Sequence, residues 1–183
     1  MPPARSKARK RALDVLFEAE LRGIPVLDLL AERIALASPP VSAYAADLVR
    51  GVTEHAARID ELISEFAEGW TLDRMPAVDR NVVRIGIYEL LWAPDVPDGV
   101  AISEAVLLAR DLSTDASPAF VNGLLARIAE LKPSLQVLAL GEADAQAEAA
   151  QHAEEPERGR TGARDHPADG NGGGEQEEHL DRL

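Results

Sequence analysis

The chain has 183 residues, of which 46% are apolar and only 4% aromatic, and its formal net charge is −13. The absence of cysteine excludes disulfides, thiolate metal sites and cysteine nucleophiles. No apolar run approaches the roughly 18 residues that span a bilayer, and the basic start of the chain is not followed by the apolar stretch of a secretory signal. We therefore expect a cytoplasmic protein. Because Ala, Leu, Val and Ile dominate without long period-two alternation, we expect it to be all-α.

Apolar residues recur at spacings of three and four through residues 1–136, which predicts a compact bundle of about six to seven helices. The expected helices cover residues 5–22, 26–37, 42–68, 77–92, 101–112 and 117–132. The helix over 77–92 is apolar on nearly all sides, so it should be the central one. The dipeptide Lys132-Pro133 should end the last helix.

The C-terminal segment differs in composition from the rest. Residues 136–183 carry twelve acidic and four arginine side chains, a net charge of −8, which leaves −5 for residues 1–135. Large apolar residues are nearly absent after Leu140, so burial cannot offset the entropy lost on ordering. We therefore expect a helical domain over residues 1–136 and a disordered acidic tail over 137–183, whose Ala-rich start continues a helix for a turn or two.

The sequence offers few candidates for chemistry. Of the four histidines only His55 precedes the tail, and a lone histidine on a helix is usually a surface or packed residue. No HExxH, GxSxG or Gly-rich phosphate loop occurs, and GNGGGE in the tail lacks the lysine and the strand that frame a phosphate loop. We expect no catalytic residue, metal site or cofactor, and therefore a protein that is not an enzyme.

The last predicted helix has two special positions. Ser117 is a good N-cap, with Pro118 in the first helical position. Asn122-Gly123 is a frequent hairpin signal, but helical spacing runs through the pair, so we place it inside the helix. Glycine there costs roughly 1 kcal/mol relative to alanine, which predicts the close approach of another backbone or of a ligand.

The segment RSKARKR near the start is the densest block of positive charge in this acidic chain. Its basic residues are Arg5, Lys7, Arg9, Lys10 and Arg11. Positive charge in the first turn opposes the helix dipole, which suggests a compensating gain from binding anions. Lysine and arginine that neutralise phosphates would bind single-stranded RNA largely independently of its sequence. The alternative is a frayed end that only improves solubility.

Four segments between residues 5 and 132 form a specific combination. They are ARKRALDVLFEAEL, LVRGVTEHAARIDELI, DRNVVRIGIYELLWAPDVPDGVAISEAVLLAR and SPAFVNGLLARI. In this order and spacing they resemble the NusB family of bacterial transcription antitermination factors, while the acidic tail lies outside the resemblance.

The resemblance implies an all-helical fold of two small subdomains, in which the first three helices pack on the remainder. It implies that the arginine-rich helix contacts boxA RNA in ribosomal RNA transcripts. It also implies a heterodimer with the ribosomal protein NusE, which binds boxA more tightly than NusB alone. With other Nus factors this complex makes RNA polymerase resistant to termination, and no membrane is involved.

Carried over by position, the resemblance implies an RNA-binding set that extends beyond the basic helix. Phe17 matches a position that is usually aromatic near the RNA. Asp115 and Ser117 fall in a loop near the RNA and partner surfaces, just before Phe120 and Asn122. Together with the five basic residues of RSKARKR, these complete the predicted RNA-binding residues.

Three alternatives accompany this interpretation. NusB-like domains also begin RNA cytosine methyltransferases, but those enzymes need a catalytic cysteine and a further domain, which this chain lacks. A protein-binding scaffold of the same fold without independent RNA binding remains open. So does a homodimer, because some relatives self-associate through the same surfaces.

Overall fold

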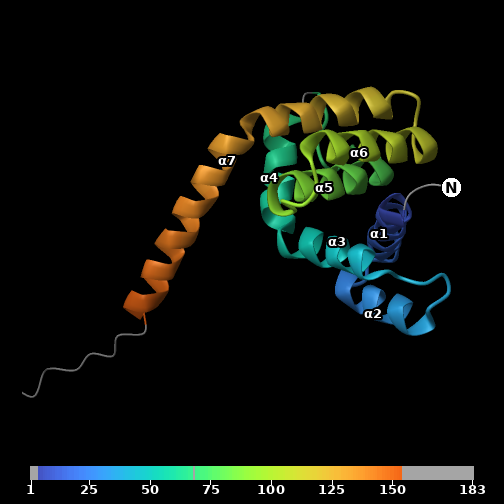
Figure 1. The fold of residues 1–183 in the computed structure, drawn as a ribbon, viewed down its shortest axis with the longest axis horizontal. Coiled ribbons are helices and arrows are strands. Elements are labelled where there is room, and N and C mark those ends of the chain that lie inside the picture. The colour runs from blue at the N-terminus through green and yellow to red at the C-terminus, as the bar shows by residue number, and fades with distance from the viewer. Residues whose placement is uncertain (1–3, 68, 154–183) are drawn as a thin grey trace, which may run out of the picture. The chain divides into compact units, whose positions relative to one another are not determined.

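The computed structural model describes residues 4–67 and 69–153, with side chains as far as Leu135. All regular structure in these residues is helical, which confirms the all-α fold class (Figure 1). The helices are α1 (Ala4–Arg22), α2 (Val26–Leu36), α3 (Ala43–Glu54), α4 (Ala56–Phe66), α5 (Ala77–Trp92), α6 (Asp98–Leu112) and α7 (Ser117–Ala153). None of the described helices is long and apolar enough to cross a membrane.

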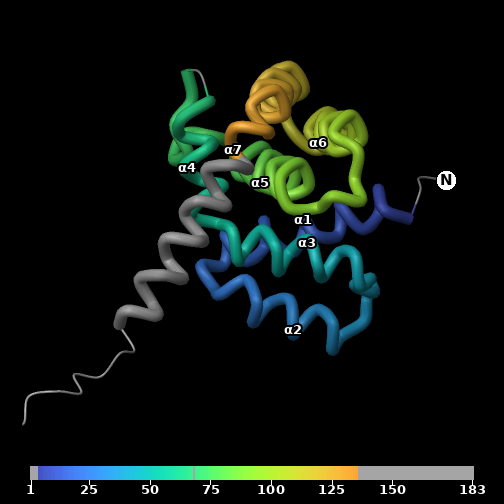
Figure 2. The backbone as a smooth tube through the Cα atoms, turned by 60° about the vertical axis from the view of Figure 1, so that its left-hand side comes forward, coloured from blue at the N-terminus to red at the C-terminus, as the bar shows by residue number. Residues whose placement is uncertain are grey.

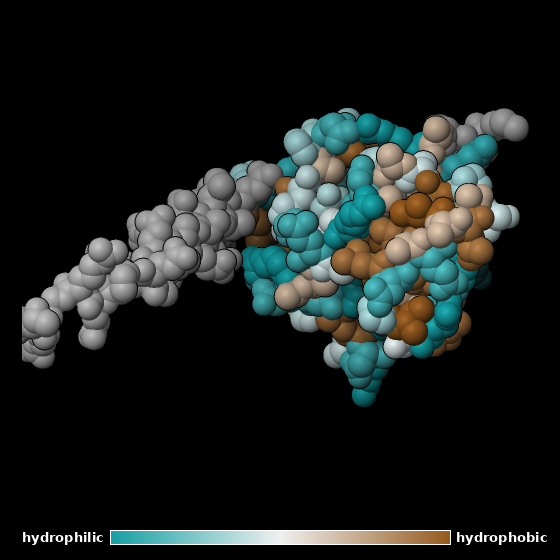
Figure 3. Space-filling view, turned by 90° about the horizontal axis from the view of Figure 1, so that it is seen from below, coloured by the Kyte–Doolittle hydropathy of each residue, from teal (hydrophilic) through white to brown (hydrophobic). Residues whose placement is uncertain are grey.

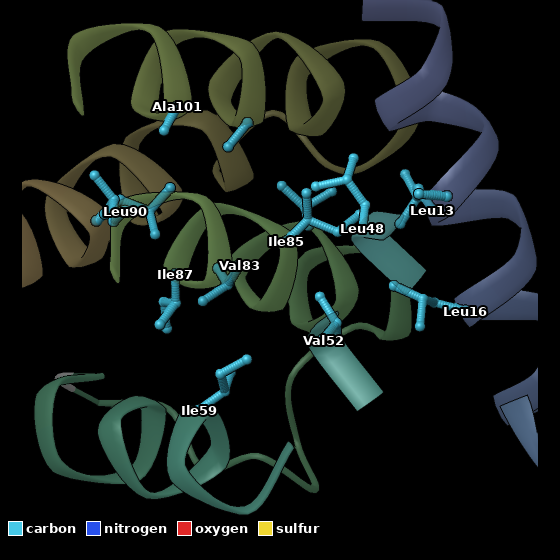
Figure 4. Close-up of a cluster of buried hydrophobic side chains, with 14 of the residues drawn as sticks. Leu13, Leu16, Leu48, Val52, Ile59, Val83, Ile85, Ile87, Leu90 and Ala101 are labelled. Atoms are coloured by element: carbon cyan, nitrogen blue, oxygen red, sulfur yellow. The ribbon is translucent and has the colours of Figure 1, made fainter. Parts of the chain in front are cut away.

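Helix α5 is central, as its apolar sequence predicts. It packs against α1, α3, α4 and α6, and Figure 2 shows it in the middle of these helices. Its buried side chains meet those of the surrounding helices in one core, part of which is drawn in Figure 4. Gly86 lets α7 come close, because a Cβ at this position would lie 2.6 Å from Leu125 Cδ1.

Helices α1, α2 and α3 pack on one another, and α1 and α3 also pack on α5, whereas α4, α6 and α7 lie on the other sides of α5 (Figures 1 and 2). The first of the two expected subdomains comprised the predicted helices over 5–22, 26–37 and 42–68, and therefore also α4, which packs on α5 and α3. Gly51 of α3 is required where α3 meets α5, since a Cβ there would overlap the ring of Tyr88 in α5.

The predicted long helix over 42–68 is wrong in one respect, because it is two helices that meet at His55. Helix α3 buries Leu48 and Val52 against α1 and α5, whereas α4 turns to bury Ile59 against α5. A single straight helix could not make both of these packing contacts. The His55 ring fills the bend and stacks on Trp92, with centroids 4.2 Å apart and planes at 9°.

The last helix differs from prediction at both ends. Ser117 is its first helical residue rather than the N-cap, and its buried hydroxyl bonds other side chains. The helix does not stop at Pro133 but continues to Ala153. Pro133 is exposed, so water can satisfy the carbonyl that its missing N–H leaves free. The remainder of the predicted tail, residues 154–183, lies outside the described residues.

Helix α2 presents apolar side chains to solvent. Leu27 is 49% exposed, Ile34 42% and Leu36 57%. Figure 3 views the molecule from the side on which α2 lies in Figure 1, and apolar residues gather there among polar ones. A shallow cavity between α2 and Arg50 of α3 follows this face.

Candidate nucleic-acid interface

The basic residues of α1 point to three sides of the helix rather than one. Arg5 and Arg9, four residues apart, face α3 and α5. Arg11 faces the loop before α3, and Lys7 and Lys10 face α6. The predicted single phosphate-binding surface is therefore divided, and each part has a different environment.

Arg9 does not face solvent. Its side chain is 3% exposed, and its Nε lies 2.9 Å from Oε2 of Glu89, which is 1% exposed. Arg9 also donates to the Tyr44 hydroxyl at 3.3 Å and lies 3.3 Å from a carboxylate oxygen of Glu104. Burial disfavours its charge, but the bonds to Glu89 prevail, so the pKa of Arg9 is raised. The prediction that Arg9 contacts RNA does not fit this placement, because a phosphate would have to break a buried ion pair.

Arg5 and Arg11 are also engaged within the protein. The Arg5 guanidinium lies 2.7 Å from Asp95 and over the Tyr44 ring, 4.8 Å from its centroid. Arg5 remains half exposed, so a phosphate can compete with Asp95. Arg11 donates to the Pro39 carbonyl at 3.1 Å, and its buried Nε has no hydrogen-bond partner among the residues that the structure describes. Arg11 is thus held by the loop between α2 and α3.

Lys7 and Lys10 line a groove of about 270 Å³ between α1 and α6, which we call the lysine groove. Across from them, α6 contributes Leu107, Leu108 and Arg110. Lys7 makes none of the ion pairs formed among the described residues, and Lys10 lies 3.6 Å from Asp14 in an exposed i,i+4 pair that is worth little in water. Glu104 and Asp111 also line the groove, so its three cations exceed its carboxylates by one, and Lys7 and Lys10 are the cations available beside the apolar floor.

The residues of α6 were not among the predicted site residues. Arg110 and Leu107 are separated from Lys10 by almost a hundred residues, so only the fold brings them together. A sequence signal existed nonetheless. Leu107 and Leu108 are adjacent large apolar residues, and neighbouring residues of a helix do not point to the same side; Leu108 packs partly against the core, whereas Leu107 is 40% exposed.

The lysine groove is not lined by any of the predicted RNA-binding residues outside RSKARKR. Phe17 is half-buried on α1, and Asp115 and Asn122 are exposed. Ser117 is buried, and its hydroxyl donates to Asp79 at 2.7 Å and accepts from the Thr114 N–H.

Phe120 of α7 is half-buried and packs against Trp70 with ring centroids 6.1 Å apart. It lines a separate groove between α4 and α7. The structure thus does not bring the predicted aromatic and basic residues onto one continuous surface.

No cluster of three or more histidine and acidic side chains suited to a metal occurs in the part of the chain that the structure describes. His55, the one histidine that sequence analysis weighed, stacks on Trp92 at the bend between α3 and α4. The fold and the lysine groove define an all-helical protein with a small cationic surface.

The family is shown by comparison with known sequences. The model of the NusB family matches residues 6–130, and the chain belongs to this family. The transcription antitermination protein NusB of Thermobifida fusca is 59% identical over 134 residues, which cover 73% of this chain and 94% of that protein. That of Kineococcus radiotolerans is 64% identical over 132 residues, covering 72% and 97%.

Solved structures of NusB proteins support the same family assignment. NusB of T. maritima superimposes with a TM-score of 0.62 at 36% identity, over 71% of this chain and 93% of that one. A crystal structure of the antitermination factors NusB and NusE in complex with dsRNA matches with a TM-score of 0.61 at 28% identity, over 69% and 96%. The family match ends before residue 137, so the predicted acidic tail lies outside it.

Proposed function

We propose that the chain is a transcription antitermination factor that binds boxA RNA of ribosomal RNA transcripts together with NusE, and so promotes processive elongation by RNA polymerase. Family membership supports this role, as does the similarity to a NusB that was crystallised with NusE and RNA. The structural observation that supports RNA binding by this chain is the lysine groove. The chain would act in the cytoplasm, where bacterial transcription takes place, and without catalysing a reaction.

The lysine groove has the chemistry that a single RNA strand requires. The Lys7 and Lys10 ammonium groups can neutralise phosphates and release counterions, whereas the Arg110 guanidinium is already 3.1 Å from Asp111 in an exposed pair with which a phosphate would compete. The apolar floor at Leu107 and Leu108 can receive the faces of bases or riboses. Because residues 1–135 carry a net charge of −5, the rest of the body repels RNA and confines it to the basic start of α1, where Arg5 is also half exposed.

A protein-binding scaffold without independent RNA binding is the second candidate. The observation in its favour is that Arg5, Arg9 and Arg11 are all bonded within the protein. On this hypothesis their role is to fix α1 in the fold. RNA binding would then require cations supplied by the partner protein.

The deciding experiment is fluorescence anisotropy of a short boxA RNA titrated with this protein, with and without purified NusE, over a series of salt concentrations. Tighter binding with NusE and an affinity that falls steeply with salt support the antitermination role and count the phosphates engaged. Association of the two proteins without specific RNA binding would favour the scaffold. Sedimentation in the same buffers would show whether a homodimer takes part.

A further inference from the structure

The lysine groove is both cationic and apolar, so phosphate alone does not match it. Its lining places Lys7 and Lys10 of α1 beside Leu107 of α6, which is 40% exposed. The two carboxylates of the lining already face arginines, at 3.3 and 3.1 Å. A fully complementary ligand therefore carries negative charge and aliphatic side chains on one short segment.

Two other grooves lack available cations. In the shallow cavity along α2, the charged lining residue is Arg50, which lies 3.4 Å from Asp47. In the groove between α4 and α7 it is Arg127, which is offset by Glu130 at 3.3 Å. This second groove includes the space beside Gly123, where a Cβ would meet nothing within 4 Å among the described residues. The predicted close approach of another backbone to Gly123 is therefore wrong.

The sequence contains a segment with the chemistry that complements the lysine groove. After Leu140 the only large apolar residues are Leu180 and Leu183, and both fall in EQEEHLDRL, residues 175–183. This segment also has four carboxylates and one arginine, a net charge of −3 with His neutral. Residues 154–174 are more than twice as long, yet they carry a net charge of only −2. Acidic and aliphatic side chains are thus concentrated in residues 175–183.

The length of chain before this segment allows it to reach the groove. Helix α7 continues from Leu135 to Ala153, which adds about 27 Å. Residues 154–174 can span up to about 70 Å when extended, whereas a folded body of this size has a radius of gyration of about 14 Å. The segment can therefore meet the groove wherever α7 ends. A tether of this length gives an effective concentration on the order of millimolar.

We propose that residues 175–183 dock in the lysine groove and compete there with RNA. Carboxylates of the segment pair with Lys7 and Lys10, and its two leucines cover Leu107. The competition with RNA rests on the proposed function, whereas the docking itself does not. The segment discriminates against RNAs that make only a few phosphate contacts, because such RNAs release too few counterions to displace it.

The test uses the full chain and compares changes inside the segment with changes just before it. One variant, Leu180→Ser with Leu183→Ser, removes both aliphatic side chains. A second variant neutralises three carboxylates of the segment: Glu175→Gln, Glu177→Gln and Glu178→Gln. The matched control neutralises three carboxylates that precede the segment: Glu154→Gln, Glu155→Gln and Glu157→Gln.

Two measurements separate docking from competition. Nuclear magnetic resonance of the backbone amides reports docking in the absence of RNA. Fluorescence anisotropy of boxA RNA at low salt reports the competition. Thermal unfolding checks that the body of the protein is unchanged, and all variants should unfold at the temperature of the wild type.

Both segment variants should shift the amide signals of Lys7, Lys10 and Leu107, and they should bind boxA RNA about three- to tenfold more tightly than the wild type. The control should leave these signals in place and change the RNA affinity by no more than about twofold.

Unshifted groove signals would overturn the proposal, as would an equal gain in RNA affinity in the control, which would indicate an effect of net charge alone. Docking that weakens on dilution would mean that the segment comes from a second copy, which also overturns it. If neither the wild type nor any variant binds boxA RNA, the proposed function fails, while the amide signals still decide whether the segment docks.

Discussion

Arg9 of α1 and Glu89 of α5 form an ion pair inside the bundle, although eighty residues separate them in the sequence. The Tyr44 hydroxyl donates to the same carboxylate, so the pair also connects α3. Burial and the neighbouring Glu89 charge raise the pKa of Tyr44, which keeps its hydroxyl a donor at neutral pH. This polar cluster fixes the direction in which α1 presents its remaining basic residues.

Replacement of Arg9→Met should destabilise the protein by about 3–5 kcal/mol, because it leaves the Glu89 carboxylate buried without a cation. The double variant Arg9→Met with Glu89→Leu should lose less than the sum of the single variants, since the fully buried Glu89 charge is removed with its cation and only Glu104, which is 18% exposed, loses a partner. Urea unfolding measures both. Arg110→Ala is the control, because its pair with Asp111 is exposed, and it should stay within about 0.5 kcal/mol of the wild type. A loss below about 1 kcal/mol for Arg9→Met would contradict this view of the pair.

The burial of Arg9 could have been predicted from the sequence. Arg9 continues the apolar stripe of α1, three and four residues before the buried Ala12 and Leu13. Glu89 likewise follows the buried Ile85 on α5. A basic and an acidic residue on two buried faces imply a partner for each. The pairing itself depends on how α1 and α5 pack, which no local pattern contains.

Gly51→Ala should destabilise the protein by roughly 1–3 kcal/mol, although alanine favours a helix interior, because the new methyl group would overlap the Tyr88 ring. Adding Tyr88→Ala to this variant should recover part of the loss relative to Tyr88→Ala alone. Thermal and urea unfolding report the change. Gly99→Ala is the control in open space, and it should be neutral or slightly stabilising. Equal behaviour of the two glycine variants would argue against tight packing of Tyr88 on α3.

Glu18 should make stability depend on acidic pH. Hydrogen bonds from Arg33 and Arg22 lower the pKa of this carboxyl from 4.5 to about 2. Because the pKa of Glu18 is lower in the folded state, its ionised carboxylate stabilises the fold at pH values above its ordinary pKa of 4.5. This contribution is lost as the pH falls from 4.5 toward 2. Glu18→Gln should therefore cost up to about 1 kcal/mol at pH 7, a cost that shrinks below pH 4.5. A difference between variant and wild type that stays constant as the pH falls would show that the ion pair contributes nothing.

Lys7→Ala with Lys10→Ala should weaken boxA RNA binding and reduce the slope of log affinity against log salt by about 1 for each lysine. Arg50→Ala is the matched control, because this exposed arginine lies on α3, outside the lysine groove lining. Anisotropy over a salt series measures the slope, and calorimetry with NusE shows whether protein binding survives. An unchanged slope would favour the scaffold hypothesis, in which these lysines only increase solubility.

The grooves were beyond sequence reasoning for a physical reason. Helical periodicity places α1 and α6 along the chain, but the lysine groove exists because the fold brings Lys7 of α1 and Leu107 of α6 to the same groove. The sequence does not predict the bend at His55, because the apolar stripe of α3 continues into α4 without a break in spacing. Helices α3 and α4 are distinguished only by the direction in which each one packs on α5. Patterns along one helix predict its buried face, whereas grooves depend on pairs of helices.

Asp95→Asn should strengthen RNA binding. The Asp95 carboxylate holds the Arg5 guanidinium at 2.7 Å, and both side chains are more than half exposed, so their attraction is weak enough for a phosphate to compete. Without the carboxylate charge, Arg5 is free to contact a phosphate, and the affinity for boxA RNA at low salt should rise about two- to fivefold. Asp47→Asn removes an equal charge on α3, next to Arg50, and should have little effect. An equal rise in both variants would mean that the gain comes only from the net charge, whereas a rise confined to Asp95→Asn would show that Arg5 contacts the RNA.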